Sequence, residues 1–511
     1  MGFGFAAIFA AMWCVRWKGN ISTRRAHVWH VPLIAVAASA AVVVLRFVAH
    51  HNYDLSIDEF MPTFQAEIFR AGYLLAPIED AFLSVQTELQ PFFTYVDEDR
   101  KIWGAHYRPV HAAILALFPA NYAVVSAHAL LTGITILATA DIVRRLFPQK
   151  SGGPVLATLL LVTSPQVLLT AASGFSFTAH LALNSVWLAL FLRGSWRAHI
   201  CACVVGFFAT GIHQVHVHIL FVFPFGVAML IGIFGDRLKA IPYFVAYILA
   251  VPLWVLWPEV AVWLQTGDVS VFPRTLLDAD YLSNYVNRSE RLGSVEQTFS
   301  GLFLVTNIWR FMLWMSPALL LLLILVTYAG RRIGIVAIVC GLGIIFNILV
   351  THLLIPNQMH TLGSRYYHAF FVNFIILGLS AYYAFFDSDR FSGLRNAVTL
   401  SLLLGATFFL PLRAYQVHQK IAPRAHIQSA LGAMDFDAIV IGPSLAWFAA
   451  DFVRNDPFQQ NRPKFYFSLD SEFEPPSATS KMVIELDGLH KLGLPRGTFL
   501  EPAFEPRPSL N

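Results

Sequence analysis

The sequence is poor in charge and in cysteine. Only 13% of its 511 residues are Asp, Glu, Lys or Arg, against about 25% in an average soluble protein, while 57% are hydrophobic. This balance excludes a soluble enzyme and a disordered chain, and a net charge of +4 is too small for a surface that binds nucleic acid. The four cysteines all lie in apolar segments, so they form neither a disulfide framework nor a zinc-ligand spacing.

Acidic residues are also missing from the long hydrophobic runs. A membrane-spanning helix needs about 20 apolar residues. Eleven segments of this kind occur, near 29–49, 121–140, 153–171, 174–192, 199–217, 219–235, 240–258, 303–328, 333–354, 366–386 and 396–412. None of them contains Asp or Glu, whereas ion-coupled transporters commonly keep carboxylates inside the membrane. A transporter or lipid flippase is therefore the less favoured alternative.

Basic residues mark one side of the membrane. Every second connection between these segments carries Lys or Arg, and such connections are cytoplasmic. We therefore expect an integral, multi-pass protein, placed in a bacterial inner membrane, whose loops 50–105 and 259–300 and tail are external. Residues 2–15 fit a twelfth span best, with an interfacial helix or a signal-like start as alternatives.

The predicted fold class is an all-α polytopic membrane protein of eleven or twelve spans with a small external α/β domain. We expect the transmembrane domain to cover residues 1–412 and the small domain 413–511. In the tail, the pattern predicts two strands flanking an amphipathic helix, at Ala438–Ile441, Ser444–Asn455 and Lys464–Leu469.

Two helices are predicted in the first external region. An amphipathic pattern covers Met61–Tyr73, and the apolar run Val110–Phe118 is too short to cross the bilayer. The second helix should lie in the interface, with Arg108 and His111 at its polar start.

Adjacent carboxylates, Asp58 and Glu59, precede the first of these helices. Partial desolvation at a membrane surface raises the pKa of a carboxylate towards the range of a general base. One carboxylate would then take a proton from a hydroxyl nucleophile while the other orients it. The alternative interpretation is a solvated acidic loop.

A span followed by an external loop with Asp58-Glu59 and a helix ending in Gly72-Tyr73 resembles the C-type (GT-C) membrane glycosyltransferases. The most similar branch contains the protein O-mannosyltransferases and lipid A aminoarabinose transferases. Further stretches agree with that branch in order: 107–147, 153–192 and 363–374. Relatives often place another acid between the third and fourth spans, where this sequence reads Gly174-Phe175.

The resemblance implies a sugar linked to polyprenyl phosphate as donor and an external hydroxyl as acceptor, on lipid A, a glycan, a lipid or a protein. Asp58 would be the catalytic base and Glu59 its supporting partner. Transfer of a hexosyl or pentosyl group would invert the anomeric configuration. A second alternative is a polysaccharide ligase or polymerase that uses a diphosphate-linked glycan.

A phosphate leaving group has to be held by cations or hydrogen-bond donors. Arg365, at the mouth of the span 366–386, is the best candidate, and an interfacial anchor is its alternative role. The weaker candidates for the phosphate are His213, Gln214 and Arg108. Secondary or acceptor contacts are expected from Tyr366, His111, His216 and His218.

Three histidines at 213, 216 and 218 are spaced closely enough to hold a metal, but no carboxylate lies beside them in sequence. We expect no metal and no cofactor. A lipid-linked sugar requires no nucleotide site, which fits a sequence without a glycine-rich phosphate loop. The expected partners are the polyprenyl-linked sugar, membrane lipids and the acceptor, with no nucleic acid.

Overall fold

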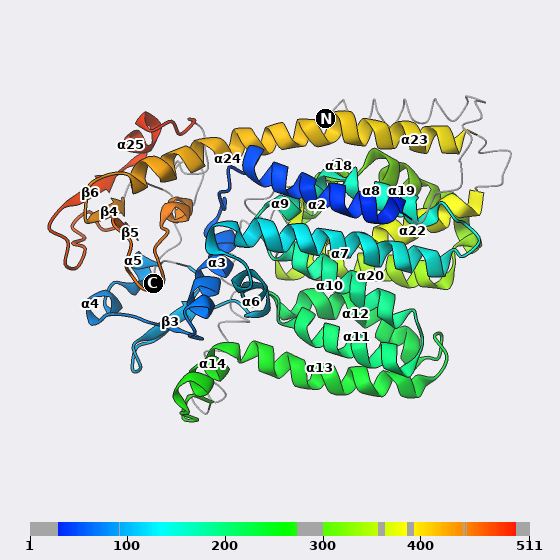
Figure 1. Ribbon diagram of the computed structural model, residues 1–511, viewed down its shortest axis with the longest axis horizontal. Coiled ribbons are helices and arrows are strands. Elements are labelled where there is room, and N and C mark those ends of the chain that lie inside the picture. The colour runs from blue at the N-terminus through cyan, green and yellow to red at the C-terminus, as the bar shows by residue number, and fades with distance from the viewer. Residues whose placement is uncertain are drawn as a thin grey trace.

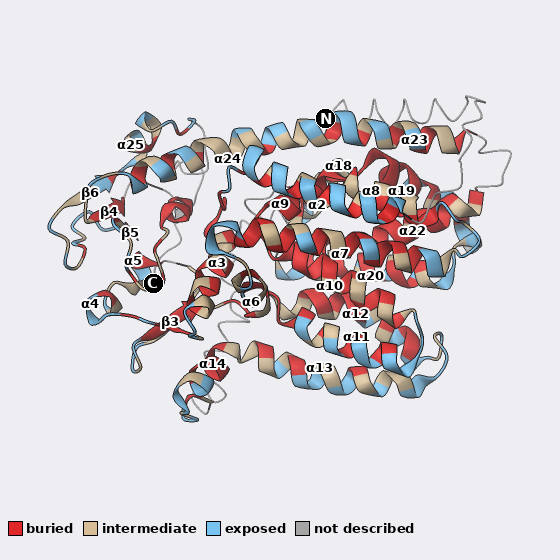
Figure 2. Cartoon of the chain, viewed as in Figure 1, coloured by how far each residue is buried: buried red, intermediate tan, exposed pale blue. Residues whose placement is uncertain are grey.

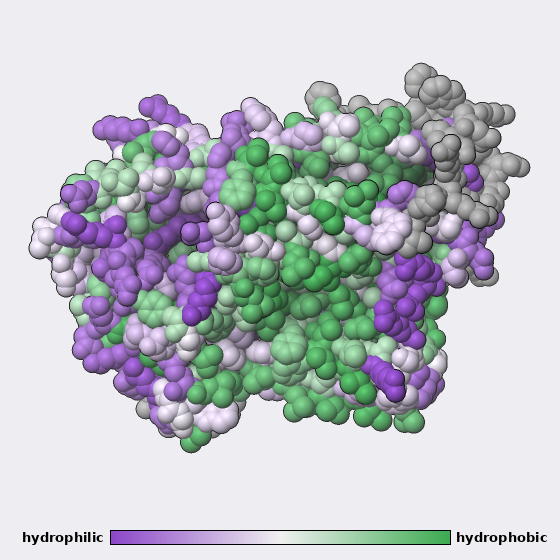
Figure 3. Space-filling model, viewed as in Figure 1, coloured by the Kyte–Doolittle hydropathy of each residue, from purple (hydrophilic) through white to green (hydrophobic). Residues whose placement is uncertain are grey.

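The computed structural model describes residues 29–90, 92–272, 300–355, 363–385, 393–442, 445 and 447–496. Long helices lie roughly alongside one another, and a smaller unit caps one end of the bundle (Figure 1). We call this end of the bundle the site end. The protein is an integral, multi-pass membrane protein, and on the face seen in Figure 3 a hydrophobic surface over the helices lies between two more polar ends.

Helices form at all eleven predicted spans, whereas residues 2–15 lie outside the described residues. In the described part of the chain, five helices are long and apolar enough to cross a membrane alone. They cover His30–Val48, Ala120–Leu146, Arg237–Val255, Ile335–Leu354 and Leu394–Gly432. These contain α2 (His30–Val48), α7 (Ala123–Leu146), α13 (Ala240–Val255) and α20 (Ile335–Leu354).

Proline breaks two of the predicted spans. The span 153–171 is a bent pair, α8 (Gly153–Val162) and α9 (Pro165–Ala172), whose axes differ by 58°. The span 303–328 is likewise two helices, α18 (Ser300–Trp314) and α19 (Pro317–Ala329). Both breaks occur where a proline cannot donate the helical hydrogen bond. Hydropathy alone does not report such a break, because both halves are apolar.

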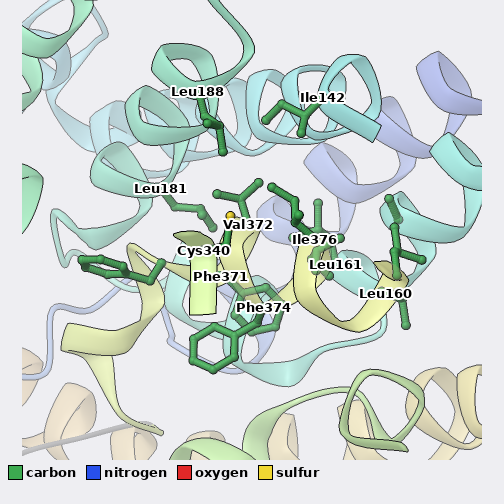
Figure 4. Close-up of a cluster of buried hydrophobic side chains, with 14 of the residues drawn as sticks. Ile142, Leu160, Leu161, Leu181, Leu188, Cys340, Phe371, Val372, Phe374 and Ile376 are labelled. Carbon is green, nitrogen blue, oxygen red and sulfur yellow. The ribbon is translucent and has the colours of Figure 1, made fainter. Parts of the chain in front are cut away.

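The remaining membrane helices are shorter: α10 (Phe177–Phe191), α11 (Trp196–Thr210), α12 (Val215–Leu230) and α22 (Phe371–Phe385). Helix α10 packs between α7 and α11, and α22 packs between α19 and α20. Their apolar side chains meet in one core, of which Figure 4 labels Ile142, Leu160, Leu161, Leu181, Leu188, Cys340, Phe371, Val372, Phe374 and Ile376. Buried residues gather inside the bundle, and α13 at its edge is mostly exposed or half-buried, as expected for a lipid-facing helix (Figure 2).

The last span continues far beyond its hydrophobic part. Helix α23 (Leu394–Leu404), a π-turn and α24 (Leu410–Gly432) form one continuous helix of 39 residues. The predicted domain boundary between 412 and 413 falls inside it. Apolar character drops after Leu412, but Val417, Ile421 and Ile427 continue the buried side of the helix. Hydropathy thus marks where lipid contact ends rather than where the helix ends.

After α24 comes a small parallel sheet of β4 (Ala438–Ile441), β5 (Lys464–Phe467) and β6 (Lys481–Ile484), in the order β5-β4-β6. We call residues 434–496 the tail domain. Two strands lie where the pattern predicted them, but the described part of the helix expected over Ser444–Asn455 forms only a short 3-10 helix, Trp447–Phe452. Tertiary hydrogen bonds explain the difference, because the side chain of Asn455 donates to the carbonyl oxygens of Leu89 and Phe465.

The region between α2 and α7 contains α3 (Ile57–Arg70), a small antiparallel sheet that the sequence did not predict, and α6 (Val110–Ala116). The sheet orders its strands β1 (Ala76–Pro77), β3 (Ile102–Ala105) and β2 (Thr94–Asp97). Trp103 of β3 is fully buried and donates from Nε1 to the carbonyl oxygen of Pro457 at 2.8 Å. Trp103 shares a core with Phe64, Val440 and Tyr466, so this region and the tail domain fold as one unit.

Replacement of Trp103 should loosen both parts of this unit together. Trp103→Ala removes a large buried side chain and leaves the carbonyl oxygen of Pro457 without its donor, at a cost of about 3–5 kcal/mol. Limited proteolysis should then cleave within both 50–105 and 434–496. The control is Trp29→Ala, where the same side chain is 79% exposed. Cleavage confined to one of the two regions would contradict a shared core.

Candidate functional site

Asp58 and Glu59 lie in the first turn of α3 rather than in the loop before it. The helix begins directly after a sharp connection from α2, in which His51 and Asn52 have positive φ angles. The side chain of Asp58 is 12% exposed and points to the groups that the sequence assigned to donor binding. The helix start therefore delivers one carboxylate into a mostly buried polar site.

Asp58 is held by groups from three other segments. Its Oδ2 lies 2.5 Å from Nη1 of Arg365, and the hydroxyl of Tyr107 donates to its Oδ1 at 2.6 Å. Nε2 of His213 lies 3.8 Å from the same Oδ1, and the His213 ring packs edge-on against Tyr107. The structure thus brings the proposed base into direct contact with the proposed phosphate anchor.

The charges in this site follow from burial and from the Arg365 contact. Burial raises the pKa of Asp58, but the Arg365 guanidinium, His213 and the Tyr107 hydrogen bond outweigh it and hold the pKa below its usual range. Burial lowers the pKa of His213 to about 4. His213 is therefore neutral at pH 7, and its approach to Asp58 is not an ion pair.

Aromatic rings support the guanidinium of Arg365. Its Cζ lies 4.5 Å from the ring centre of Phe175 and 5.2 Å from that of Tyr366. Arg365 begins the short helix α21 (Arg365–His368), and the preceding amide of Ser364 donates to Oε1 of Gln166 on α9. The connection between α9 and α10, which carries Phe175, thus helps to fix the position of Arg365.

Glu59 points away from Asp58, towards the same connection. Its Oε2 accepts a hydrogen bond from the Gly174 amide at 2.9 Å, and a Cβ atom at Gly174 would lie 2.6 Å from Oδ1 of Asp54 and 3.0 Å from Cβ of Glu59. Glycine is thus required for the approach of the two acids. Burial, with the nearby Asp54 charge, raises the pKa of Glu59 to about 8, so Glu59 is protonated at pH 7. In relatives, another acid often lies in the connection between the third and fourth spans. Here Asp54 and Glu59 lie against Gly174 of that connection.

The weaker candidates divide into two groups. The side chain of Gln214 lies within hydrogen-bond reach of Tyr366. Arg108 is 7% exposed, and its positive charge contributes to the lowered pKa of both His213 and His216. Gln214 and Arg108 are therefore linked to the Asp58–Arg365 pair through Tyr366 and His213, respectively.

His111 and His218 have other partners. His111 shares a 2.9 Å hydrogen bond with His128, whereas His218 bonds to Asn184 at 2.7 Å and to Tyr247 at 3.0 Å. Both histidines have structural contacts that account for their burial. Across the described residues, no group of three or more His, Cys, Asp or Glu side chains is arranged to hold a metal ion.

Sequence reasoning missed Tyr107 and Phe175 as parts of the site. Tyr107 directly precedes Arg108 at the start of the interfacial helix, and this position at the membrane surface is a signal that could have identified it. Its ring is also stacked on Phe93 at 5.1 Å, which fixes its hydroxyl towards Asp58. Phe175 carries no signal, because its role depends on the approach of Arg365 from a distant segment.

Comparison with known proteins gives a fold but no close relative. No family model matches the chain, and no curated protein matches it. Among solved structures, ArnT from Cupriavidus metallidurans bound to undecaprenyl phosphate matches with a TM-score of 0.54 and 15% identity, over 91% of both chains. The Archaeoglobus fulgidus oligosaccharyltransferase in complex with Zn and sulfate matches with a TM-score of 0.45 and 12% identity, over 86% of this chain and 62% of that one. The mycobacterial arabinofuranosyltransferase AftD matches with a TM-score of 0.44 and 15% identity, over 89% of this chain and 32% of that one.

The chain is thus a multi-pass membrane protein with the GT-C fold. The likeness to ArnT, which extends over nearly the whole length of both chains, carries this conclusion. The resemblance that began with Asp58-Glu59 and the order of the spans is confirmed for the fold. The assignment of individual site residues stays a prediction.

The protonated state of Glu59 has a measurable consequence. Because the pKa of Glu59 is higher in the folded than in the unfolded protein, the free energy of unfolding should fall as pH rises from about 4.5 to 8. Glu59→Gln keeps the shape of the protonated acid and cannot ionise. The Tm of this variant should exceed that of the parent by a few degrees at pH 8, and the difference should shrink towards pH 5. A difference that instead grows towards low pH would show that Glu59 is ionised in the folded protein.

Proposed function

We propose that this protein is a membrane glycosyltransferase that moves a sugar from a polyprenyl phosphate to a hydroxyl group of an acceptor, with inversion. The observation that carries the proposal is the buried contact between Asp58 and Arg365 at the start of α3, within a GT-C fold. A base and a phosphate-binding cation side by side are what an inverting transfer from a phosphate-linked donor requires. ArnT, the protein of similar fold, was crystallised with undecaprenyl phosphate.

The donor phosphate would compete with Asp58 for Arg365. A guanidinium binds two phosphate oxygens at once, and it remains charged while negative charge grows on the leaving group. Once Arg365 turns to the phosphate, Asp58 loses the partner that most strongly stabilises its ionised form, and burial then raises its pKa. Donor binding would thus convert a weak base into an effective one.

Proton and bond changes then follow from the geometry. Asp58 accepts the proton of the acceptor hydroxyl, whose oxygen attacks the anomeric carbon from the face opposite the phosphate. The bond from that carbon to the phosphate oxygen breaks, and its electron pair stays on the phosphate held by Arg365. Tyr107 would keep Asp58 oriented during the transfer, since its hydroxyl already donates to Oδ1.

The proposal places the site end of the bundle on the external side. The alternating distribution of Lys and Arg supports this orientation, because the basic connections lie at the opposite end from α3. There, Arg145 and Arg193 pair with Asp141. The acceptor remains a hydroxyl on lipid A, a glycan, a lipid or a protein, and the sugar a hexose or a pentose.

Asp58 and Arg365 should affect donor binding in opposite directions. Asp58→Asn should lower turnover by roughly 10²–10⁴ because it removes the base. The same change should tighten binding of free polyprenyl phosphate, since Arg365 no longer has to leave an anionic partner. Arg365→Ala should nearly abolish both binding and turnover, and Arg365→Lys should retain part of each, because lysine keeps the charge and loses the two-pronged contact.

Binding of polyprenyl phosphate to the purified protein in nanodiscs, measured beside turnover, tests this pattern. Arg193→Ala is the matched control, since this arginine pairs with Asp141 at the opposite end of the bundle. Equal binding by Arg365→Ala and the parent would reduce Arg365 to an interfacial anchor. Full turnover by Asp58→Asn would remove the base from the proposal.

The number of phosphates on the donor separates this proposal from a ligase or polymerase. Among the described residues, the carboxylate of Asp58 pairs with the guanidinium of Arg365, and the proposal assigns this guanidinium to a single donor phosphate. We expect the monophosphate-linked sugar to be consumed and the diphosphate-linked sugar to react at least about tenfold more slowly. Mass spectrometry of the lipid products, with each donor supplied in turn, decides between them. A preference for the diphosphate would favour the ligase or polymerase.

A further inference from the structure

The N-terminus of α3 is capped by a residue that is distant in sequence. Ser56 occupies the N-cap position but makes no side-chain capping bond, and its buried Oγ has no hydrogen-bond partner among the described residues. The first amide of the helix, that of Ile57, instead donates to Oδ1 of Asp451 at 2.9 Å. Asp451 lies on the 3-10 helix of the tail domain and is 8% exposed.

Arg454 attaches the tail domain to the same segment. Its guanidinium donates to the carbonyl oxygen of Asp54 and lies over the rings of Tyr53 and Phe60, at 4.2 Å and 5.4 Å from their centres. Its Nε also donates to the carbonyl oxygen of Asp451 at 3.1 Å, which links the two tail-domain residues. Residues 451–454 of the tail domain thus contact both α3 and the residues directly before it, through hydrogen bonds and cation–ring contacts.

A membrane helix holds the opposite side of this segment. Arg46, near the end of α2 and 3% exposed, pairs with the carboxylate of Asp54 at 2.8 Å. The same Arg46 donates to the carbonyl oxygens of Tyr53 and Ala172. Residues 53–57 are therefore fixed between an arginine of the bundle and two residues of the tail domain.

The position of α3 decides where Asp58 lies. Asp58 is the second residue of the helix, so any displacement of the first turn moves its carboxylate almost directly. Its partners Arg365, Tyr107 and His213 belong to other segments, so a displaced first turn would change the distances from Asp58 to them. A carboxylate at Asp451 also stabilises the helix electrostatically, because anions are favoured at a helix N-terminus.

We propose that Asp451 and Arg454 are positioning residues of the site, through which the tail domain holds the start of α3 in register with Arg365, Tyr107 and His213. The inference rests on the proposed function for the role of Asp58. The capping contact itself can be tested without any activity.

Hydrogen–deuterium exchange tests the contact directly. In the full-length protein, Asp451→Ala should speed exchange of the amides at residues 57–59 by about 3- to 30-fold, because the first turn loses its cap. Asp451→Asn keeps an oxygen acceptor and should leave this exchange close to that of the parent. The matched control is Asp437→Ala, since Asp437 bonds to Thr479 and Ser480 inside the tail domain. Unchanged exchange in Asp451→Ala would overturn the inference.

Kinetics then show whether the contact acts through Asp58. Asp451→Ala should lower kcat by about 10- to 100-fold, as expected for a displaced reacting group, whereas Asp451→Asn should restore most of it. The Kd for polyprenyl phosphate should not rise, because Arg365 and His213 belong to segments other than α3 and a displaced Asp58 competes less for Arg365. Arg454→Ala should behave as Asp451→Ala does.

The double variant Asp58→Asn/Asp451→Ala separates positioning from general damage. Its turnover should lie within about twofold of that of Asp58→Asn alone, because a carboxylate that has been removed cannot be misplaced. An equal loss from Asp451→Ala in both backgrounds, or a rise in Kd parallel to the fall in kcat, would overturn the positioning role. Full turnover by Asp58→Asn would instead defeat the proposed function, and the exchange of residues 57–59 would still decide whether Asp451 caps α3.

Discussion

The ion pair between Asp58 and Arg365 is the interaction on which the arrangement of the site end depends. Two charges this far from water are stable only where good geometry and further hydrogen bonds compensate for lost hydration. Here the Tyr107 hydroxyl satisfies the carboxylate, and the face of Phe175 lies against the guanidinium. The pair joins α3 to α21, the short helix that precedes α22, so it also helps to hold the unit that contains α3 on the bundle.

Glycine at position 174 makes the neighbouring acids compatible with this pair. Three carboxylates, those of Asp54, Asp58 and Glu59, lie close together, and their mutual repulsion would be severe if all were ionised. Asp54 is neutralised by Arg46, Asp58 by Arg365, and Glu59 by its own proton. A side chain at position 174 would displace two of them. The absence of a side chain at Gly174 thus allows Asp54 and Glu59 to keep the positions in which their charges are compensated.

The sequence predicts those features that a single local rule controls. Membrane spans follow from hydropathy because the bilayer demands apolar length, and the strands Ala438–Ile441 and Lys464–Phe467 follow from their apolar runs. The pairing of Asp58 with Arg365 was not predictable, although both residues were selected individually, because it depends on how distant helices meet. Asp451 and Arg454 carried no signal for the same reason. The first sheet was missed because β1 has only two residues and the short strands β2 and β3 contain Asp97 and Gly104, residue types that are depleted in strands.

The division of the site between two structural units has a physical reason. In the proposed reaction the donor diffuses within the bilayer, so its phosphate would arrive at the site end of the bundle, near Arg365 and His213. The acceptor hydroxyl would arrive on the side of the unit that contains α3 and the tail domain, where α3 carries the proposed base Asp58. In the proposed reaction the two substrates meet where the units join. Arg46 contacts the start of α3 from the bundle, and Asp451 and Arg454 contact it from the tail domain. These contacts therefore help to determine where Asp58 lies relative to Arg365.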